Sequence, residues 1–302
     1  MSRLRIVHET IYRYKRAVRF GPHRLILRPR EGHDLRVEEM RLEISPDFEL
    51  AWSLDLFGNS VAIAHITTPA DQLRIRSEVF LCQTDPFPMR LAPAEPVSFP
   101  VKFTEVESAV ASAYLASTYP QDVEKVREWV TRYVNSADVH SAEEIVARVA
   151  RAIRETINYR RREIRGVQKP AETLSEGAGS CRDMATLMLE ALRAVGLPAR
   201  FASGYLDCSA SQEGHASTHA WAEAYLPDLG WTGYDPMLGE ATCERHIVVG
   251  VSNHPRGVMP VTGTFFDNEG SFIEMTVNVQ TERFSDPVES VKFDPSETAP
   301  AG

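Results

Sequence analysis

Cysteine is scarce in this chain of 302 residues. The four that occur are Cys82, Cys181, Cys208 and Cys243, and no two of them have Cys-x-x-Cys spacing. They are too few and too scattered for a disulfide framework or a zinc ribbon. We therefore expect a chain kept in a reducing compartment and stabilised by a hydrophobic core, which a chain of this length can readily form.

Long hydrophobic runs are also missing. The first residues, MSRLRIVHETIYRYKR, alternate polar and apolar side chains and lack the apolar core of a secretory signal peptide. No stretch approaches the roughly 20 apolar residues that a membrane-spanning helix requires. The prediction is a soluble, cytoplasmic protein without membrane contacts.

Positive charge does not predominate. Lys and Arg number 33 against 42 Asp and Glu, a net charge of −9 at pH 7. This balance gives no overall reason to expect nucleic acid or an anionic membrane as a partner. The charge is unevenly spread, because residues 1–36 alone carry ten Lys and Arg against three Asp and Glu.

The composition is that of a globular protein, with 43% hydrophobic and 25% charged residues. Residues 4–83 alternate with period two, and turn residues such as Gly58-Asn59 separate the runs, which predicts six or seven short antiparallel strands. We expect an all-β, sandwich-like or barrel-like domain over residues 1–84.

Five prolines between residues 85 and 100 predict an extended linker. Helical periodicity follows, at about residues 122–134 and 142–157. We assign 101–281 to an α+β core and the Pro-, Ser- and acid-rich residues 282–302 to a flexible tail.

The most informative segment surrounds Cys181. Gly177, Gly179 and Ser180 allow a tight turn, and an almost wholly apolar helix is predicted from Cys181 to about Val195. Backbone N–H groups and the positive end of the helix dipole at its start both favour a thiolate. Taken alone, this segment is equally compatible with a small buried cysteine that has no chemical role.

A second segment offers a base. Residues 217–226 alternate strictly, so His219 lies on one face of a predicted strand, and a returning strand ends at Asp235. If Leu226 pairs with Gly230 across a three-residue loop, Asp235 lies diagonal to His219; a five-residue loop would place it directly opposite. Loops of two or four residues would turn Asp235 to the other face. The sequence allows the pair without requiring it.

Together these segments resemble the bacterial transglutaminase-like superfamily, whose members include cysteine proteases. The core motifs that carry the resemblance are Gly179-Ser-Cys-Arg-Asp, Leu192-Arg-Ala-Val-Gly-Leu-Pro-Ala-Arg, Ser203-Gly-Tyr, Thr218-His-Ala-Trp-Ala-Glu and Tyr234-Asp-Pro. His8-x-Thr-x-Tyr-x-Tyr, Arg24-Leu-Ile-Leu-Arg-Pro and Asp55-Leu-Phe-Gly-Asn are similar to the β domain that precedes this core in bacterial members.

The resemblance implies a papain-like α+β core. It also implies a role for each member of a triad: Cys181 as nucleophile, His219 as general base and acid, and Asp235 as the residue that orients the imidazole.

Four further residues are candidates for the site. Tyr159 and Trp221 are possible oxyanion donors by residue type, and Tyr205 and Glu223 are possible cleft residues. Packing or structural roles are equally open for each of them. Cys82, Cys208 and Cys243 are expected to be inert core thiols.

A metal site and a cofactor are not predicted. His215, His219 and Cys208 are close in sequence, but strand geometry from residue 217 onward separates the two rings. The basic run of Arg160, Arg161 and Arg162 with Arg165 is compatible with a solvated loop, a phosphate or acidic partner, or recognition of a substrate carboxylate.

The sequence predicts a thiol-dependent enzyme that hydrolyses an amide, peptide or isopeptide bond in a protein, peptide or small amide. Amine transfer, as in cross-linking enzymes, is the first alternative. The second is a catalytically silent binding protein that uses the basic N-terminal stretch. The oligomeric state is left open.

Overall fold

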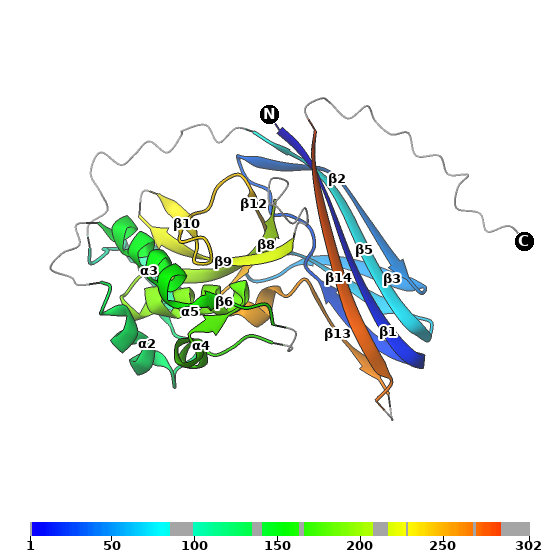
Figure 1. Ribbon diagram of the computed structural model, residues 1–302. Coiled ribbons are helices and arrows are strands. Elements are labelled where there is room, and N and C mark those ends of the chain that lie inside the picture. Colours follow the sequence, from blue (N-terminus) through cyan, green and yellow to red (C-terminus); the bar gives the residue numbers. More distant parts are fainter. Residues whose placement is uncertain are drawn as a thin grey trace, which may run out of the picture.

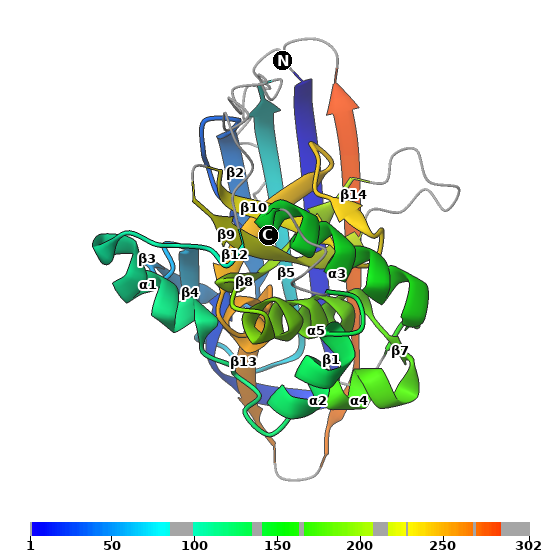
Figure 2. The same ribbon diagram turned by 90° about the vertical axis from the view of Figure 1, so that its left-hand side faces the viewer.

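The computed structural model describes residues 2–84, 99–134, 141–162, 166–207, 217–227, 229–267 and 270–284. It has the expected α+β fold class, with an antiparallel half-barrel sheet followed by helices and a second sheet. Figure 1 shows the half-barrel on the right and the helical part on the left. Turned by 90°, Figure 2 shows the helices in front, the second sheet behind them and the long strands of the half-barrel at the back.

The half-barrel is organised around one long strand, β1 (Ser2–Leu25). Its first half pairs with β5 (Ala70–Gln83), and its last residues, His23 to Leu25, pair with β4 (Ser60–Ile66). β2 (Leu35–Ser45) and β3 (Phe48–Leu54) extend the sheet beyond these two neighbours. Alternate residues of β1 are buried, which accounts for the period-two pattern of the sequence.

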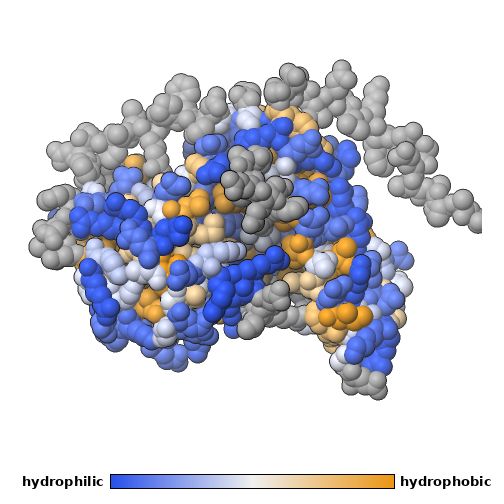
Figure 3. Space-filling model, viewed as in Figure 1, coloured by the Kyte–Doolittle hydropathy of each residue, from blue (hydrophilic) through white to orange (hydrophobic). Residues whose placement is uncertain are grey.

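Two strands from the other end of the chain complete this sheet. β13 (Val261–Phe266) and β14 (Phe272–Phe284) both pair antiparallel with β1, so that Phe284 lies opposite Arg3. Apolar residues are visible over these strands at the lower right of Figure 3, and the exposed ones are Phe266, Ile273, Met275 and Val277.

This return of the chain differs from the expected division into domains. The sequence pattern places residues 261–281 in the core and 282–302 in the tail, whereas residues 261–266 and 272–284 pair with the first strand. Apart from residues 99–100 and 282–284, the predicted linker and tail lie outside the described residues.

The helical part contains five α-helices among the described residues. They are α1 (Glu105–Leu115), α2 (Val123–Val130), α3 (Ala142–Thr156), α4 (Pro170–Glu176) and α5 (Cys181–Ala194), and a short 3-10 helix, η1 (Pro255–Val258), follows later. α2, α3 and α5 match the predicted helices, whereas α1 and α4 are additional. All of α5 from Asp183 to Arg193 is buried, as its apolar sequence predicts. None of the described helices is long and apolar enough to cross a membrane.

The second sheet supports α5. Its strand order is β11 (Glu240–Ala241), β10 (Gly230–Asp235), β9 (Ser217–Leu226), β8 (Ala199–Leu206) and β12 (His246–Ser252). The small side chains Ala220, Ala222 and Ala224 of β9 are buried in the core shared with α5, which permits close packing of helix on sheet. A two-strand parallel pair, β6 (Asn158–Tyr159) and β7 (Ala178–Gly179), leads directly into α5.

Candidate active site

Cys181 is the first residue of α5, and a buried carboxylate fixes that end of the helix. Asp183 Oδ2 accepts hydrogen bonds from the backbone N–H and the hydroxyl of Ser180, both at 2.8 Å. Its Oδ1 accepts from the backbone N–H of Gln168 at 2.7 Å and from Arg162 at 2.9 Å. Asp183 itself is fully buried, whereas Cys181 is only half-buried. The thiol is thus held on a rigid turn while remaining accessible.

Gly179 explains why the approach to Cys181 is glycine-rich. A Cβ at this position would lie 2.8 Å from the Cβ of Asp183, so a side chain would displace the capping carboxylate. Gly179 also pairs with Tyr159 across β6 and β7, and its carbonyl accepts the N–H of Arg160 at 2.8 Å. The pair of short strands therefore determines the direction in which the chain enters α5.

His219 and Asp235 meet because of the hairpin register. Leu226 pairs with Gly230, which is the three-residue loop among the alternatives considered, and Tyr234 pairs with Ala222. Asp235 then lies diagonal to His219, and the distance from His219 Nε2 to Asp235 Oδ2 is 2.6 Å. Both side chains are buried.

The imidazole of His219 lies between two partners. Burial alone would lower its pKa, but hydrogen bonds to Asp235 and to Cys181, with the charges of both groups, raise the pKa to about 10. Because Nε2 is engaged by Asp235, Nδ1 is the nitrogen left for the thiol. A protonated imidazole in this position stabilises a thiolate.

Asp235 remains ionised despite its burial. Burial favours the neutral acid, but hydrogen bonds from His219 and His246 hold the pKa of the carboxyl well below its usual range. The second of these partners was not among the predicted site residues. His246 Nε2 lies 3.1 Å from Asp235 Oδ2. Its strand, β12, joins the same sheet through β8, where His246 pairs with Leu206, a long-range pairing that local periodicity does not specify.

His219, Asp235 and His246 form a cluster of possible metal ligands, because one ligand atom from each lies within 4.8 Å of the others. A zinc ion about 2.0–2.1 Å from two ligands that are only 2.6 Å apart would hold them at an angle of roughly 80°, far from tetrahedral. In addition, His246 Nδ1 accepts the backbone N–H of Cys243, so its Nε2 carries the proton. The arrangement fits a hydrogen-bonded proton network. His215 and Cys208, considered earlier as ligands, lie outside the described residues.

The other predicted site residues have identifiable environments. Tyr159 is 53% exposed, on the strand beside the entry to Cys181. Trp221 is buried against the rings of His219 and His246. Tyr205 is buried with its hydroxyl 2.9 Å from His8 Nδ1, and Glu223 is paired with Arg200 at 2.6 Å. An oxyanion role for Tyr159 or Trp221 therefore stays a prediction, while the contacts of Tyr205 with His8 and of Glu223 with Arg200 are structural ones.

The remaining cysteines differ from the expectation. Cys82 is half-buried and Cys243 is exposed, so the prediction of a core thiol is wrong for Cys243. Its Sγ lies 3.7 Å from His246 Nδ1. Cys208 lies outside the described residues.

The basic run upstream of Cys181 takes part in ion pairs. Arg160 pairs with Glu176, and Arg162 pairs with the capping carboxylate of Asp183. Arg165 lies outside the described residues. The observed contacts of Arg160 and Arg162 are with carboxylates of this chain, so they support a structural role for these two residues.

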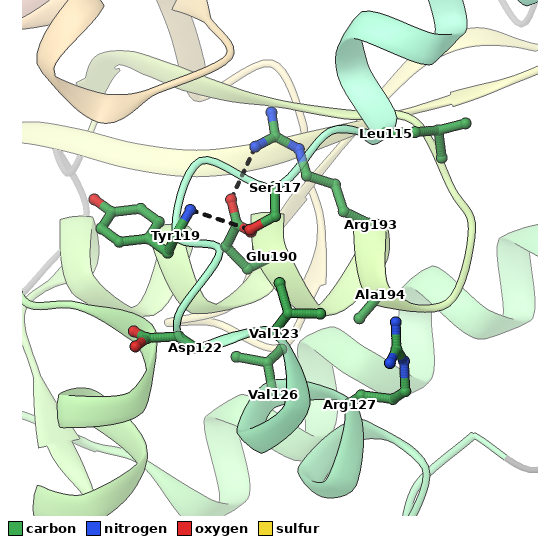
Figure 4. Close-up of a pocket in the computed structure, with 10 residues that line it drawn as sticks. All are labelled: Leu115, Ser117, Tyr119, Asp122, Val123, Val126, Arg127, Glu190, Arg193 and Ala194. Carbon is green, nitrogen blue, oxygen red and sulfur yellow. Dashed lines mark hydrogen bonds and ion pairs between the residues drawn. The ribbon is translucent and has the colours of Figure 1, made fainter.

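A cavity of about 190 Å³ lies at the opposite end of α5. Figure 4 shows Glu190 and Arg193 from the last turns of the helix, 2.8 Å apart and facing the loop that carries Ser117 and Tyr119. Nine to twelve helical residues correspond to roughly 14–18 Å from Cys181. Glu190 also accepts hydrogen bonds from Ser117 and Thr118, so the charges in this cavity anchor the loop on the helix.

Comparisons with known proteins agree with the motifs. Residues 4–80 match the bacterial transglutaminase-like N-terminal region, and residues 127–236 match the transglutaminase-like superfamily. The protein Rv2569c of Mycobacterium tuberculosis is 29% identical over 292 residues, covering 92% of each chain. ML0607 of Mycobacterium leprae is 26% identical over 285 residues, covering 92% of this chain and 99% of its own.

A solved structure has the same fold. It is a candidate cysteine protease from Cytophaga hutchinsonii, with a TM-score of 0.72 and 15% sequence identity, covering 94% of this chain and 90% of its own. Both parts of the fold and their order are thus found together in another protein.

Proposed function

Because the chain combines the bacterial transglutaminase-like N-terminal region with a transglutaminase-like core, we propose that it is a thiol-dependent acyl-transfer enzyme that uses Cys181, His219 and Asp235. The observation that carries the proposal is the position of the His219 ring, with Nε2 2.6 Å from Asp235 Oδ2; Cys181 is also one of the groups that raise the pKa of this ring. A nucleophile, a base and an orienting acid in this order constitute a working triad.

In the proposed reaction, the Cys181 thiolate attacks the carbonyl carbon of an amide and forms a carbon–sulfur bond. The carbon–nitrogen bond then breaks, and the leaving amine takes the proton from His219 Nδ1. A water molecule gives its proton to the same nitrogen and attacks the thioester. The acid leaves and the thiolate is restored, so that atoms and protons balance over one cycle.

Two groups would assist these steps. Asp235 keeps the imidazole in the orientation that presents Nδ1 to the thiol. The backbone N–H groups at the start of α5 supply positive potential for the oxyanion of the tetrahedral intermediate. Tyr159, exposed beside this turn, is our candidate for a second donor.

The proposed substrate class is an amide, peptide or isopeptide bond, with water as the acceptor. Amine transfer uses the same thioester and differs only in the group that resolves it. Measuring ammonia release from dimethylcasein together with incorporation of a primary amine such as cadaverine separates the two outcomes, because both release ammonia and only transfer attaches the amine. Incorporation of cadaverine in place of hydrolysis would favour transfer.

A silent binding protein with a basic N-terminal surface is the remaining alternative. Most arginines of that stretch make ion pairs with carboxylates; the pairs include Arg3–Glu38, Arg5–Glu78, Arg13–Glu274, Arg16–Asp267 and Arg24–Asp55. Charges neutralised within the sheet have little potential left for an external partner. This observation favours the enzyme.

Thiol labelling tests the proposal without knowledge of the substrate. Iodoacetamide at neutral pH should modify Cys181 at least tenfold faster than the exposed Cys243, because His219 stabilises the thiolate. The fast phase should vanish in Cys181→Ser and persist in the matched control Cys243→Ser. Slow and equal modification of all four cysteines would contradict an activated thiol.

A further inference from the structure

The way His246 is held determines where its proton lies. Its Nδ1 accepts the backbone N–H of Cys243 at 3.1 Å, and its Nε2 lies 3.1 Å from Asp235 Oδ2. A ring nitrogen that accepts a hydrogen bond carries no proton of its own. The proton of the neutral ring is therefore on Nε2, and His246 donates it to Asp235.

His246 and His219 make different contacts. His246 is held at both ring nitrogens, by the N–H of Cys243 and by Asp235, whereas His219 uses Nε2 for Asp235. Asp235 therefore has two imidazole partners, of which only His219 belongs to the proposed triad.

Asp235 is held at both of its oxygens. Oδ1 accepts the backbone N–H of Met237 at 2.9 Å, and Oδ2 accepts both ring N–H groups. Trp221 packs edge-on against His246, with ring centroids 5.2 Å apart and planes at 79°. The carboxylate is fully buried, so water does not freely replace a donor that it loses, and the loss leaves part of its charge uncompensated.

We propose that His246 is a positioning residue that fixes Asp235 Oδ2 for His219 by donating its Nε2 proton to that oxygen. The inference rests on the proposed function, because it gives His246 its role through Cys181 and His219. His246 is buried and acts through Asp235, with no contact to a substrate required.

Two substitutions separate the two nitrogens of His246. In His246→Gln the side-chain amide can occupy the Nε2 position and donate to Asp235. In His246→Asn the shorter side chain can accept the N–H of Cys243 but does not reach Asp235. We expect iodoacetamide labelling of Cys181 within about threefold of wild type for glutamine, and slower by about tenfold to a hundredfold for asparagine, the factor that loss of a hydrogen bond to a charged group corresponds to.

Cys243→Ala is the matched control, because it removes the neighbouring thiol and keeps the backbone N–H; its Cys181 should label at the wild-type rate. Equal labelling in the glutamine and asparagine variants, both folded by circular dichroism, would overturn the role of His246. If the asparagine variant does not fold, the glutamine variant alone tests the proposal. Its proton NMR spectrum must still show the downfield resonance of the His219–Asp235 hydrogen bond, and loss of that resonance overturns the proposal. A wild-type Cys181 that labels no faster than Cys243 would refute the proposed function itself, so the two failures are distinguishable.

Discussion

At the scale of single residues, the properties of the site depend on the hydrogen-bond and charge partners of its buried ionisable side chains. Asp235 and His219 are both shielded from water, and each helps to keep the other ionised, together with Cys181 beside His219 and His246 beside Asp235. Removing either partner leaves an uncompensated charge, which costs about 3–5 kcal/mol in a buried pair. Reactivity and stability therefore depend on the same few contacts.

Substituting Asp235 by Asn should reduce activity more than it disturbs the fold. The amide keeps the shape of the side chain but can present an N–H to His219 Nε2, which reverses the hydrogen bond and the tautomer. We expect the rate of thioester formation to fall by about 10²–10⁴-fold, measured as acylation of Cys181. Near-wild-type acylation in a folded Asp235→Asn variant would show that another group orients the imidazole.

The protonation of His219 also predicts how stability depends on pH. Its pKa is about 10 in the folded chain against 6.5 as the ordinary value, so the folded state binds this proton more tightly. The resulting stabilisation is complete below about pH 6.5 and is lost as the pH rises to about 10. The difference in unfolding free energy between wild type and Asp235→Asn, measured in urea, should be largest near pH 6 and shrink towards pH 10. A difference that stays constant over this range would contradict the assigned ionisation.

At the scale of elements, the start of α5 is the part that determines where the thiol lies. Asp183 joins the helix to Ser180, to Gln168 and to Arg162. Those donors come from the preceding turn and from the segment between β6 and α4, so one carboxylate holds these two segments together at the start of the helix that carries Cys181.

The substitution Asp183→Ala should therefore strongly destabilise the fold. It leaves buried N–H groups and a guanidinium without their acceptor, and we expect a loss of about 3–5 kcal/mol in unfolding free energy, with slower labelling of Cys181. Glu172→Ala on the neighbouring helix α4 is the control, because Glu172 is exposed and should change stability by less than about 0.5 kcal/mol. Comparable urea midpoints for the two variants would refute a special role for the capping carboxylate.

Elements with a strong local signal were predictable from the sequence. The apolar run of α5, the apolar stripe of α3 and the period-two alternation of side chains in β9 each specify one type of secondary structure. The possible lengths of the hairpin loop limited the position of Asp235 relative to His219 to a few pairing registers. α1 was missed because only Ala111 of that helix is buried, so it has no apolar stripe. His246 was missed because its place beside Asp235 depends on the pairing of β12 with β8.

At the scale of the whole molecule, the two ends of the chain share one sheet, and that sheet contacts the second sheet, to which the strands of the site belong. Nδ1 of His8 in β1 and the hydroxyl of Tyr205 in β8 form a hydrogen bond of 2.9 Å. The hydroxyl of Thr281 in β14 donates a hydrogen bond of 2.8 Å to the carboxylate of Asp207. The pairing of β14 with β1 spans more than 250 residues. Local patterns contain no information about such a partner, which is why the division into domains differed from the prediction.

Tyr205→Phe tests the coupling between these two parts. The substitution removes the hydroxyl and leaves His8 Nδ1 buried without its partner, with the pKa of that ring already lowered by burial to about 4. We expect the unfolding free energy to fall by about 1–3 kcal/mol. Tyr133→Phe, whose hydroxyl has no hydrogen bond within the described ranges, should have little effect. Equal effects of the two substitutions would mean that the contact contributes nothing.

The central claim is that Cys181 forms a thioester with the help of His219. The most direct measurement is the reaction with p-nitrophenyl acetate, followed by release of nitrophenolate and by intact mass. The account predicts a burst of one nitrophenolate per chain and a single acetyl group on Cys181 that hydroxylamine removes. It also predicts that the burst is absent in Cys181→Ser. No burst in the wild type, or acetylation in equal amount in Cys181→Ser, would contradict it.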